Sequence, residues 1–359
     1  MPLTTAEFDY PLDPGCIAQQ PAGQRDQSRL MALSRRTGRR GHHVFAELPS
    51  LLRPGDLMVM NDTRVIPARF FCRRRTGGKI EGLFLREQSP GRWRVLLRHA
   101  GRCRLGEAIT LIGGDDVALE LLESEGEGRW LVGVDPPRAA ADVLAEAGRT
   151  PLPPYIRRSN DAAGPPGEEQ ADRRRYQTVY AARDGAIAAP TAGLHFTEAV
   201  LAELNRRGVA VARVTLHVGL GTFAPVKAEL LADHQMHSEW YELPASSADA
   251  LNAARADGRR VVAVGTTSVR VLETAAASGD VFAAQAGWTD LFLYPPARFE
   301  AVDALITNFH LPRSTLLMLV AAFCSPGGTA GVGLILDAYA EAARTGYRFY
   351  SYGDAMLIE

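Results

Sequence analysis

Between Phe70 and Asp135 the chain consists of short apolar runs that are separated by turn residues. Clusters such as Ser89-Pro90-Gly91 and Gly113-Gly114-Asp115-Asp116 end these runs, which recur every ~8–13 residues. We therefore expect strands over residues 80–86, 93–99, 109–112, 117–122 and 130–134. Short strands with turns at such regular intervals predict a small antiparallel barrel or sandwich.

After Tyr176 the pattern changes to an alternation of helices and strands. Thr197, Ser246 and Ser314 each precede a run with helical apolar spacing and are expected to cap helices. Asp249 follows Ser246 at the spacing of a capping box. Residues 209–218 and 261–264 are expected to be strands between these helices. The alternation predicts an α/β domain with a largely parallel sheet.

An early segment belongs to this second pattern. Met58-Val59-Met60 follows the turn Pro54-Gly55-Asp56 and is expected to be a strand. We predict a discontinuous three-layer α/β domain, residues 1–68 and 152–359, into which a small antiparallel β-barrel domain, residues 69–151, is inserted. The polar stretch from Arg157 to Arg175 is expected to be a mobile loop.

Composition narrows the class of protein. The 359 residues are 46% hydrophobic and 23% charged, which excludes a wholly disordered chain. No apolar run reaches the ~18 residues that a membrane helix needs, and no apolar leader is visible. We therefore expect a cytoplasmic protein with no membrane partner. The four cysteines have no paired spacing, which argues against disulfide bonds and against a cysteine-rich zinc site.

The net charge of −1 hides local clusters of arginine. Lysine occurs only at Lys79 and Lys227, so nearly all of the 40 basic residues are arginines. They gather in three clusters, at residues 35–40, 73–75 and 173–175. A nearly neutral protein with such clusters can still bind a phosphate backbone, although any single cluster by itself favours a solvated loop.

Three loops place a histidine at the end of an expected element. His195 lies just before a helix cap, His217 at the end of a strand, and His310 just before another cap. Glycine, alanine and threonine neighbours let a ligand approach the backbone there. Side chains at element ends gather into functional sites more often than those in the middle of an element. For any one of these histidines, a purely structural role is the alternative.

Two further segments favour ligand binding. Gly265-Thr266-Thr267-Ser268 joins a strand to a helix, where backbone N–H groups can bind an anion, although an ordinary capped turn has the same residues. Asn61-Asp62-Thr63-Arg64 follows a strand, and its carboxylate can orient a ribose or a cation, or satisfy the turn. His234, His237 and Glu239 suggest a metal site, but no metal-binding motif accompanies them, and we expect no metal.

Together these segments resemble the S-adenosylmethionine:tRNA ribosyltransferase-isomerase family of queuosine biosynthesis. The matching segments span the chain: Phe8-Asp9-Tyr10, Arg25 to Leu30, Asn61 to Arg69, Arg175 to Ala181, Ala189 to Thr197, Thr215 to Phe223, His234 to Tyr241, Val264 to Glu273, Ile306 to Phe323 and Tyr347 to Ile358. Leu293 to Pro296 departs from the family pattern, in which a Pro-Gly turn is expected.

The resemblance implies a transferase that uses S-adenosylmethionine as a ribosyl donor. It would transfer and isomerise the ribosyl group onto 7-aminomethyl-7-deazaguanine at the tRNA wobble position, and release adenine and methionine. The product would be epoxyqueuosine-tRNA. S-adenosylmethionine is then a co-substrate, and no permanently bound cofactor is expected. The family fold, an α/β domain with an inserted β-barrel, is similar to the division predicted above.

The resemblance also implies the site residues. His195, His217 and His310 are the acid–base candidates, without an assignment of which does what. Asp62, Glu239 or Thr266 would hold ribose hydroxyls or the methionine ammonium, and Arg270 or Arg313 a carboxylate or phosphate. The full set of expected substrate-binding residues is Asp62, Thr63, Arg64, Thr191, Gly193, Phe196, Gly219, Thr222, Phe223, Glu239, Gly265, Thr266, Thr267, Arg270, Asn308 and Arg313.

The expected partner is the tRNA anticodon loop, and we expect the protein to be a monomer. Phe196, Phe223, Phe309 and Tyr176 are candidates for stacking on unstacked bases, with the arginine clusters on phosphates. A tRNA methyltransferase is an alternative, disfavoured because no glycine-rich turn follows an N-terminal strand. A non-catalytic RNA-binding protein is another, but it gives the histidine loops no purpose.

Overall fold

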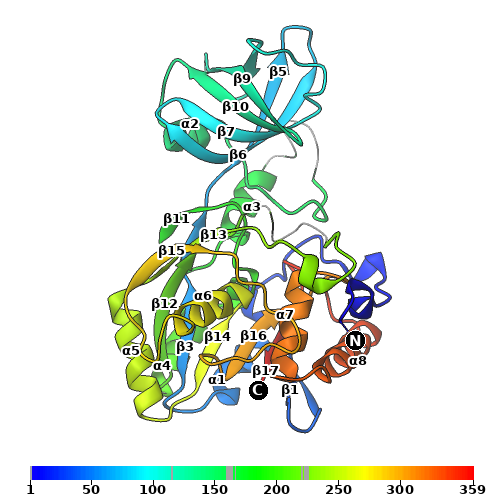
Figure 1. Cartoon of the computed structure of the whole chain (residues 1–359), viewed down its shortest axis with the longest axis vertical. Helices are drawn as coiled ribbons and strands as arrows, with labels where there is room; N and C mark the ends of the chain where they lie inside the picture. Colours follow the sequence, from blue (N-terminus) through cyan, green and yellow to red (C-terminus); the bar gives the residue numbers. More distant parts are fainter. Residues whose placement is uncertain (1, 115, 159–164, 166, 220, 222–225) are drawn as a thin grey trace. The chain divides into compact units, whose positions relative to one another are not determined.

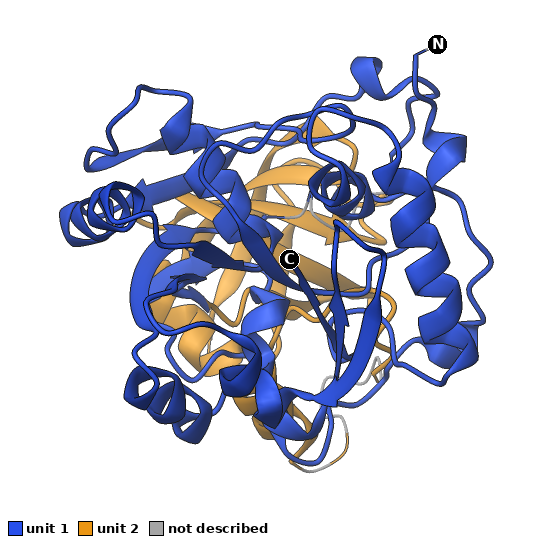
Figure 2. Cartoon of the chain, turned by 90° about the horizontal axis from the view of Figure 1, so that it is seen from below, with its two compact units in different colours: residues 1–64, 177–359 blue, residues 65–176 orange. Residues whose placement is uncertain are grey.

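A computed structural model describes residues 2–114, 116–158, 165, 167–219, 221 and 226–359. Its contacts divide the chain into two compact units, residues 1–64 with 177–359 and residues 65–176, which are coloured separately in Figure 2. These bounds group residues 65–68 and 152–176 with the second unit. The domain boundaries inferred from the sequence differ at both ends and stay a prediction.

A nine-stranded sheet forms the first unit. Its strands, in spatial order, are β15 (Gln285–Thr289), β13 (Glu239–Leu243), β12 (Ala210–Leu216), β3 (Leu57–Asn61), β14 (Val261–Val264), β16 (Ala304–Asn308), β17 (Ala355–Ile358), β1 (Arg29–Leu33) and β2 (Arg40–Val44). The segment around Met58 is therefore a central strand of this sheet, as expected.

The sheet is mixed, which corrects the prediction of a largely parallel one. β12, β3, β14 and β16 run parallel to one another, as do β1 and β17. The pairs β12–β13, β13–β15, β16–β17 and β1–β2 are antiparallel. The apolar runs revealed the buried parallel block, whereas strand direction at the margins depends on how the chain returns, which periodicity does not encode.

Helices cover both faces of the sheet and give three layers (Figure 1). The helices of this unit are α1 (Leu48–Leu51), α4 (Glu198–Arg206), α5 (Ala245–Ala256), α6 (Thr266–Ala276), α7 (Thr315–Cys324) and α8 (Gly331–Arg344). Because strand side chains alternate, Met58 and Met60 of β3 pack in one core with Leu204 of α4. Among the residues that the structure describes, no helix is both long enough and apolar enough to span a membrane.

Two of the three predicted helix caps are confirmed. Thr197 Oγ1 accepts a hydrogen bond from Val200 N at the start of α4, and Ser314 Oγ accepts one from Leu317 N at the start of α7. Ser246 does not cap α5, because the helix already begins at Ala245 and Pro244 occupies the cap position. Proline at that position leads directly into the helix, so Ser246 falls within the first turn.

A closed antiparallel barrel forms the second unit. Its strands, in spatial order, are β10 (Arg129–Asp135), β7 (Arg92–Arg98), β6 (Lys79–Ser89), β5 (Arg69–Arg74), β8 (Ala108–Leu111) and β9 (Ala118–Gly126). Trp93 fills its interior and meets the rings of Phe70 and Phe84 edge-on, with centroids 6.4 and 5.4 Å away. The predicted α/β fold with a small antiparallel barrel is confirmed.

The stretch from Arg157 to Arg175 is not a loop throughout. Its second half is the helix α3 (Glu168–Arg175), and α2 (Ala140–Ala147) is the other helix of this unit. α3 has no apolar stripe, so its sequence gave no helical periodicity. Ion pairs hold it instead: Asp172 accepts two hydrogen bonds from Arg158, at 2.9 and 3.0 Å, with both side chains buried.

Candidate active site

The carboxyl ends of four neighbouring parallel strands lie along one edge of the nine-stranded sheet. β12, β3, β14 and β16 are adjacent and point the same way. The residues that follow or end them are His217, Asp62, Gly265 and Asn308. Ligands of open α/β sheets bind at such an edge. The fold thus brings together four segments that are spread over more than 200 residues of the sequence.

Asn61, at the end of β3, forms hydrogen bonds to several of the segments at this edge. Its Nδ2 donates to the carbonyl of Leu216, at 3.0 Å, and to Thr267 Oγ1, at 3.2 Å. Its Oδ1 accepts hydrogen bonds from the backbone N–H groups of Thr63 and Leu216, each at 3.1 Å. Asn61 is completely buried, so these bonds fix β3, β12 and the start of α6 relative to one another.

Two further hydrogen bonds position Asp62, Thr63 and His217 next to it. Asp62 Oδ1 accepts from the Thr215 hydroxyl at 2.7 Å, and Thr63 Oγ1 lies 2.8 Å from His217 Nδ1. The imidazole of His217 stacks on the indole of Trp240, with centroids 5.0 Å apart and an interplanar angle of 19°. One side of the ring and one of its nitrogens are therefore positioned by the protein.

His217 is half-buried, and this burial lowers its pKa, although the carboxylates of Asp62, Asp184 and Glu242 oppose the shift. β4 (Thr63–Val65) pairs with β11 (Arg183–Ala186), and Gly185 of β11 lies against the ring. A Cβ atom at Gly185 would stand 2.7 Å from His217 Nε2. Only glycine leaves room for the imidazole ring there, and Nε2 makes no hydrogen bond to the described residues.

His195 is held more tightly. It ends the 3₁₀ helix η5 (Thr191–His195), its Nδ1 lies 2.7 Å from Ser28 Oγ, and its Nε2 lies 3.1 Å from Asn308 Nδ2. The Asn308 amide also accepts from the Thr191 hydroxyl through Oδ1, at 2.8 Å. Its Nδ2 therefore faces His195, which makes Nε2 an acceptor and leaves the ring proton on Nδ1, toward Ser28.

Both ring nitrogens of His195 thus have protein partners, and burial lowers its pKa to about 3. His310 is also buried, and its pKa is likewise lowered to about 3. Its Nδ1 and Nε2 each lie 3.3 Å from a hydroxyl, that of Tyr339 and that of Thr307. At neutral pH both imidazoles are uncharged.

Glu239 and Arg270 form a buried ion pair with other partners. Glu239, the first residue of β13, accepts from Gly219 N through Oε1 at 2.7 Å and pairs with Arg270 through Oε2. Arg270 also donates to the carbonyl groups of Leu291 and Thr289, each at 3.1 Å. The pair therefore positions the loop that follows β12, and the guanidinium of Arg270 is already committed to protein oxygens.

The other predicted residues lie in different surroundings. Arg64 and Arg313 are exposed and pair with Asp184 and Asp9 respectively. Phe196 is completely buried between Phe45 and Tyr180, so a stacking contact with a base is not available to it in this conformation. Phe309 and Tyr176 are buried as well.

Small residues line the starts of η5 and α6. Gly265 precedes α6 at a φ of 86°, a backbone conformation that favours glycine. Thr266 and Thr267 begin the helix and are buried. A Cβ atom at Gly193 would stand 2.0 Å from Tyr180 Oη. Thr222 and Phe223 lie outside the described residues.

Three residues of this edge were not singled out from the sequence, namely Ser28, Tyr180 and Trp240, and Asn61 was named only as part of its turn. Each lies in a segment that carries the family resemblance, which was the available clue. Nothing in the local pattern, however, indicates that Ser28 meets a histidine 167 residues away. Among the described residues, no group of three or more His, Cys, Asp or Glu side chains is arranged to hold a metal ion.

Comparison with known proteins gives a consistent answer. A family model described as "Queuosine biosynthesis protein" matches residues 5–358. A protein of Trichlorobacter lovleyi is 49% identical over 356 residues, 99% of this chain and 100% of its own length, and one of Geobacter sulfurreducens is 50% identical over 360 residues, 99% and 100%. Both are named S-adenosylmethionine:tRNA ribosyltransferase-isomerase.

A solved structure is similar over the whole chain. It is the crystal structure of S-adenosylmethionine tRNA ribosyltransferase from Thermotoga maritima. The match has a TM-score of 0.55 and 37% identity, and it covers 98% of this chain and 100% of that one.

Proposed function

The chain belongs to the queuosine biosynthesis protein family, and from this premise we propose that it transfers and isomerises the ribosyl group of S-adenosylmethionine onto 7-aminomethyl-7-deazaguanine in the tRNA wobble position. Epoxyqueuosine-tRNA, adenine and methionine are the proposed products. The observation that carries the proposal is the gathering of Asp62, Thr63 and His217 at the carboxyl edge of the sheet, beside the start of α6.

The reaction needs a base, because a proton next to the sulfonium must be removed before the ribosyl group can rearrange. His217 is the best of the three predicted histidines for this role. Its lowered pKa keeps the imidazole neutral at physiological pH, and Nε2 makes no hydrogen bond to the described residues. Thr63 would hold the ring through Nδ1, so that Nε2 meets the substrate. Such a base contributes about 10²–10⁴-fold to the rate.

The neighbours of His217 suit the ribose of the co-substrate. One carboxylate oxygen of Asp62 accepts a hydrogen bond from Thr215, and we assign the other oxygen to a ribose hydroxyl. Thr266 and Thr267 bring the first backbone N–H groups of α6 to this edge, where a carboxylate is favourably bound, whereas the N–H of Gly265 already donates to the carbonyl of Ile306. We assign the methionine carboxylate to this helix start and not to Arg270, whose donors already bond protein oxygens.

His195 and His310 have a different proposed role. Both are buried and neutral, and His195 bonds protein groups through both nitrogens. We propose that His195 orients Asn308 and Thr191 beneath the substrate, and that His310 supports the loop after β16. An acid–base role for either stays a prediction that single substitutions can test.

The decisive experiment incubates the protein with S-adenosylmethionine and tRNA that carries 7-aminomethyl-7-deazaguanine. We expect adenine and methionine in equal amounts, together with a modified nucleoside whose mass matches epoxyqueuosine. Formation of S-adenosylhomocysteine would instead identify a methyltransferase, and tRNA binding without turnover a non-catalytic RNA-binding protein. The same tRNA with unmodified guanine at the wobble position is the control, because it lacks the attacking amine.

A further inference from the structure

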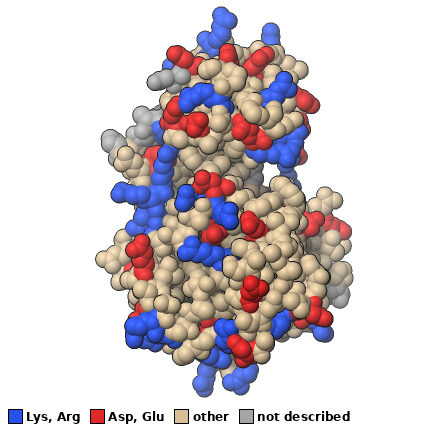
Figure 3. Space-filling view, turned by 90° about the vertical axis from the view of Figure 1, so that its left-hand side faces the viewer, with Lys and Arg blue, Asp and Glu red and all other residues tan. Residues whose placement is uncertain are grey.

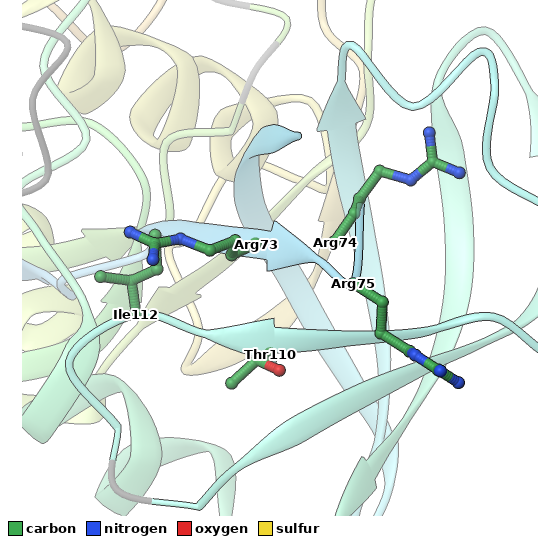
Figure 4. Close-up of a pocket in the computed structure, with 5 residues that line it drawn as sticks. All are labelled: Arg73, Arg74, Arg75, Thr110 and Ile112. Carbon is green, nitrogen blue, oxygen red and sulfur yellow. The ribbon is translucent and has the colours of Figure 1, made fainter. Parts of the chain in front are cut away.

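A pocket of about 330 Å³ lies on the barrel unit, and none of the residues proposed above for chemistry lines it. It is lined by Arg73, Arg74, Arg75, Thr110 and Ile112, and Figure 4 shows the three arginine side chains leaving the end of β5 in different directions. Three arginines that line one hollow give it a positive potential, which attracts an anionic ligand unless acidic neighbours neutralise it.

An acidic neighbour accounts for only one of the three. Arg74 donates to both carboxylate oxygens of Glu107, at 2.6 and 3.0 Å, and to the carbonyl of Arg102 at 3.0 Å. Arg73 and Arg75 are exposed, and neither forms an ion pair or hydrogen bond with the described residues. Two guanidinium groups at the pocket are thus available to a ligand.

More positive charge lies next to Arg73. Across the barrel surface it is paired in register with Lys79 of β6 on one side and Thr110 of β8 on the other. Two residues along β5, the ring of Phe71 has the cations of Arg69, Lys79 and Arg149 at 5.0, 5.6 and 5.6 Å from its centroid. Of these cations, Arg69 is neutralised by Glu81 at 2.9 Å, and Lys79 also has an interaction partner.

In the other two arginine clusters, several guanidinium groups form ion pairs or hydrogen bonds within the protein. Arg35 donates to the carbonyl groups of Phe323 and Asp303, and Arg40 pairs with Glu341. In the third cluster, Arg173 pairs with Glu169 and donates to the carbonyl of Gly148. Figure 3 shows Lys and Arg side chains interspersed with Asp and Glu over the face that it draws. The cluster at β5 differs because its arginines line a hollow, whereas exposed arginines as such also occur in the first cluster, at Arg36 and Arg39.

We propose that this pocket, together with Lys79 and Arg149, binds the phosphate backbone of the RNA substrate. The proposal rests on the function proposed above, because it identifies the partner as the tRNA. The fork of an arginine matches two phosphate oxygens, and the Thr110 hydroxyl adds a donor. None of the five lining residues is aromatic, which suits a phosphate contact and not the stacking of a base.

The test compares two double variants that remove the same charge from the same barrel. Arg73→Gln/Arg75→Gln changes the pocket. Arg92→Gln/Arg129→Gln changes exposed arginines of β7 and β10, and β10 is three strands from β5 in the closed barrel. Thermal unfolding first establishes that both variants fold. tRNA binding is then measured between 50 and 300 mM salt, alongside the KM values for tRNA and S-adenosylmethionine.

For the pocket variant we expect tRNA affinity to fall about tenfold at ~0.15 M salt, and the slope of log K against log salt to flatten by about 1.5–2, the loss of two phosphate contacts. The KM for tRNA rises in proportion, while kcat and the KM for S-adenosylmethionine stay unchanged. The control variant keeps the wild-type slope within ~0.5.

Two results overturn the proposal. One is a pocket variant that binds tRNA as the wild type does. The other is an equal loss in both variants, which would show a diffuse charge effect. Either result leaves the proposed function standing, provided that the wild-type protein releases adenine. If the wild type binds tRNA with the expected salt dependence but releases no adenine, the proposed function fails while the pocket is still tested by the two slopes.

Discussion

The hydroxyl oxygen of Thr63 lies 2.8 Å from Nδ1 of His217, and the indole of Trp240 stacks on the same imidazole. The three residues come from β4, from the end of β12 and from β13. The ring is therefore fixed at one nitrogen and on one side, while Gly185 leaves room for its other nitrogen, which makes no hydrogen bond to the described residues. A base needs such an orientation before its pKa matters.

The first prediction concerns His217 and Thr63. His217→Gln is expected to lower kcat about 10²–10⁴-fold without loss of fold. Burial lowers the pKa of His217 from its usual 6.5, so the neutral base persists below pH 6.5 and activity falls only as the pH drops through the lowered value. The acidic limb of the kcat/KM profile should vanish in His217→Gln.

Variants of Thr63 test whether its hydroxyl positions the imidazole of His217 or only stabilises the fold. Thr63→Val, which keeps the shape but loses the hydroxyl, is expected to lower kcat about tenfold with little change in KM. Thr63→Ser restores the hydroxyl and should recover most of the rate. A His217→Gln enzyme that retains the acidic limb would contradict the assignment of His217 as the base.

Much of the scaffold was predictable from the sequence because its causes are local. Thr197 and Ser314 cap their helices through groups three residues away, and Met58-Val59-Met60 is a strand on its apolar content alone. The barrel strands follow from short apolar runs between turns. These features need no knowledge of distant residues.

The rest depended on contacts between distant segments. Asn61 meets Leu216 and Thr267, which lie 155 and 206 residues away in sequence. Arg270 was a natural candidate for an anionic ligand, but its partner Glu239 lies on a strand whose place in the sheet the sequence did not reveal. α3 was missed because ion pairs hold it, not an apolar face.

The second prediction uses the Glu239–Arg270 pair. Both side chains are almost fully buried, so Arg270→Ala leaves a carboxylate buried without its partner. We expect the free energy of unfolding to fall by about 3–5 kcal/mol. Arg313→Ala breaks an exposed pair with Asp9 and should cost less than ~1 kcal/mol. Denaturant unfolding measures both. If Arg270→Ala were as stable as Arg313→Ala and lost only co-substrate binding, Arg270 would be a ligand residue after all.

The third prediction links the buried histidines to pH. The pKa of His310 is about 3 in the folded protein and about 6.5 when exposed. Below pH 6.5 the imidazole of His310 therefore binds a proton in the unfolded chain but not in the folded protein. The free energy of unfolding consequently falls as the pH drops from 6.5 toward 3. His310→Gln should remove up to ~1.4 kcal/mol per pH unit from this slope. Identical slopes for the wild type and His310→Gln would refute the linkage.

The fourth prediction concerns Tyr180 and Gly193. Tyr180 Oη is buried without a hydrogen-bond partner among the described residues, and it lies where a side chain at Gly193 would begin. Tyr180→Phe removes an oxygen that makes no protein hydrogen bond, so the melting temperature should stay the same or rise. Any loss of kcat or rise in KM would then report contact of that oxygen with a substrate.

Gly193→Ala tests the same contact from the other side. Its Cβ atom would stand 2.0 Å from Tyr180 Oη and 2.8 Å from Thr178 Cγ2, so the variant should be destabilised by about 1–3 kcal/mol. In Gly193→Ala/Tyr180→Phe the nearest obstacle is gone, and the double variant should lose less stability than the sum of the two single changes. A strictly additive double-mutant cycle would mean that the backbone moves away from Tyr180 when alanine is introduced, and that the hydroxyl does not define the space beside Gly193.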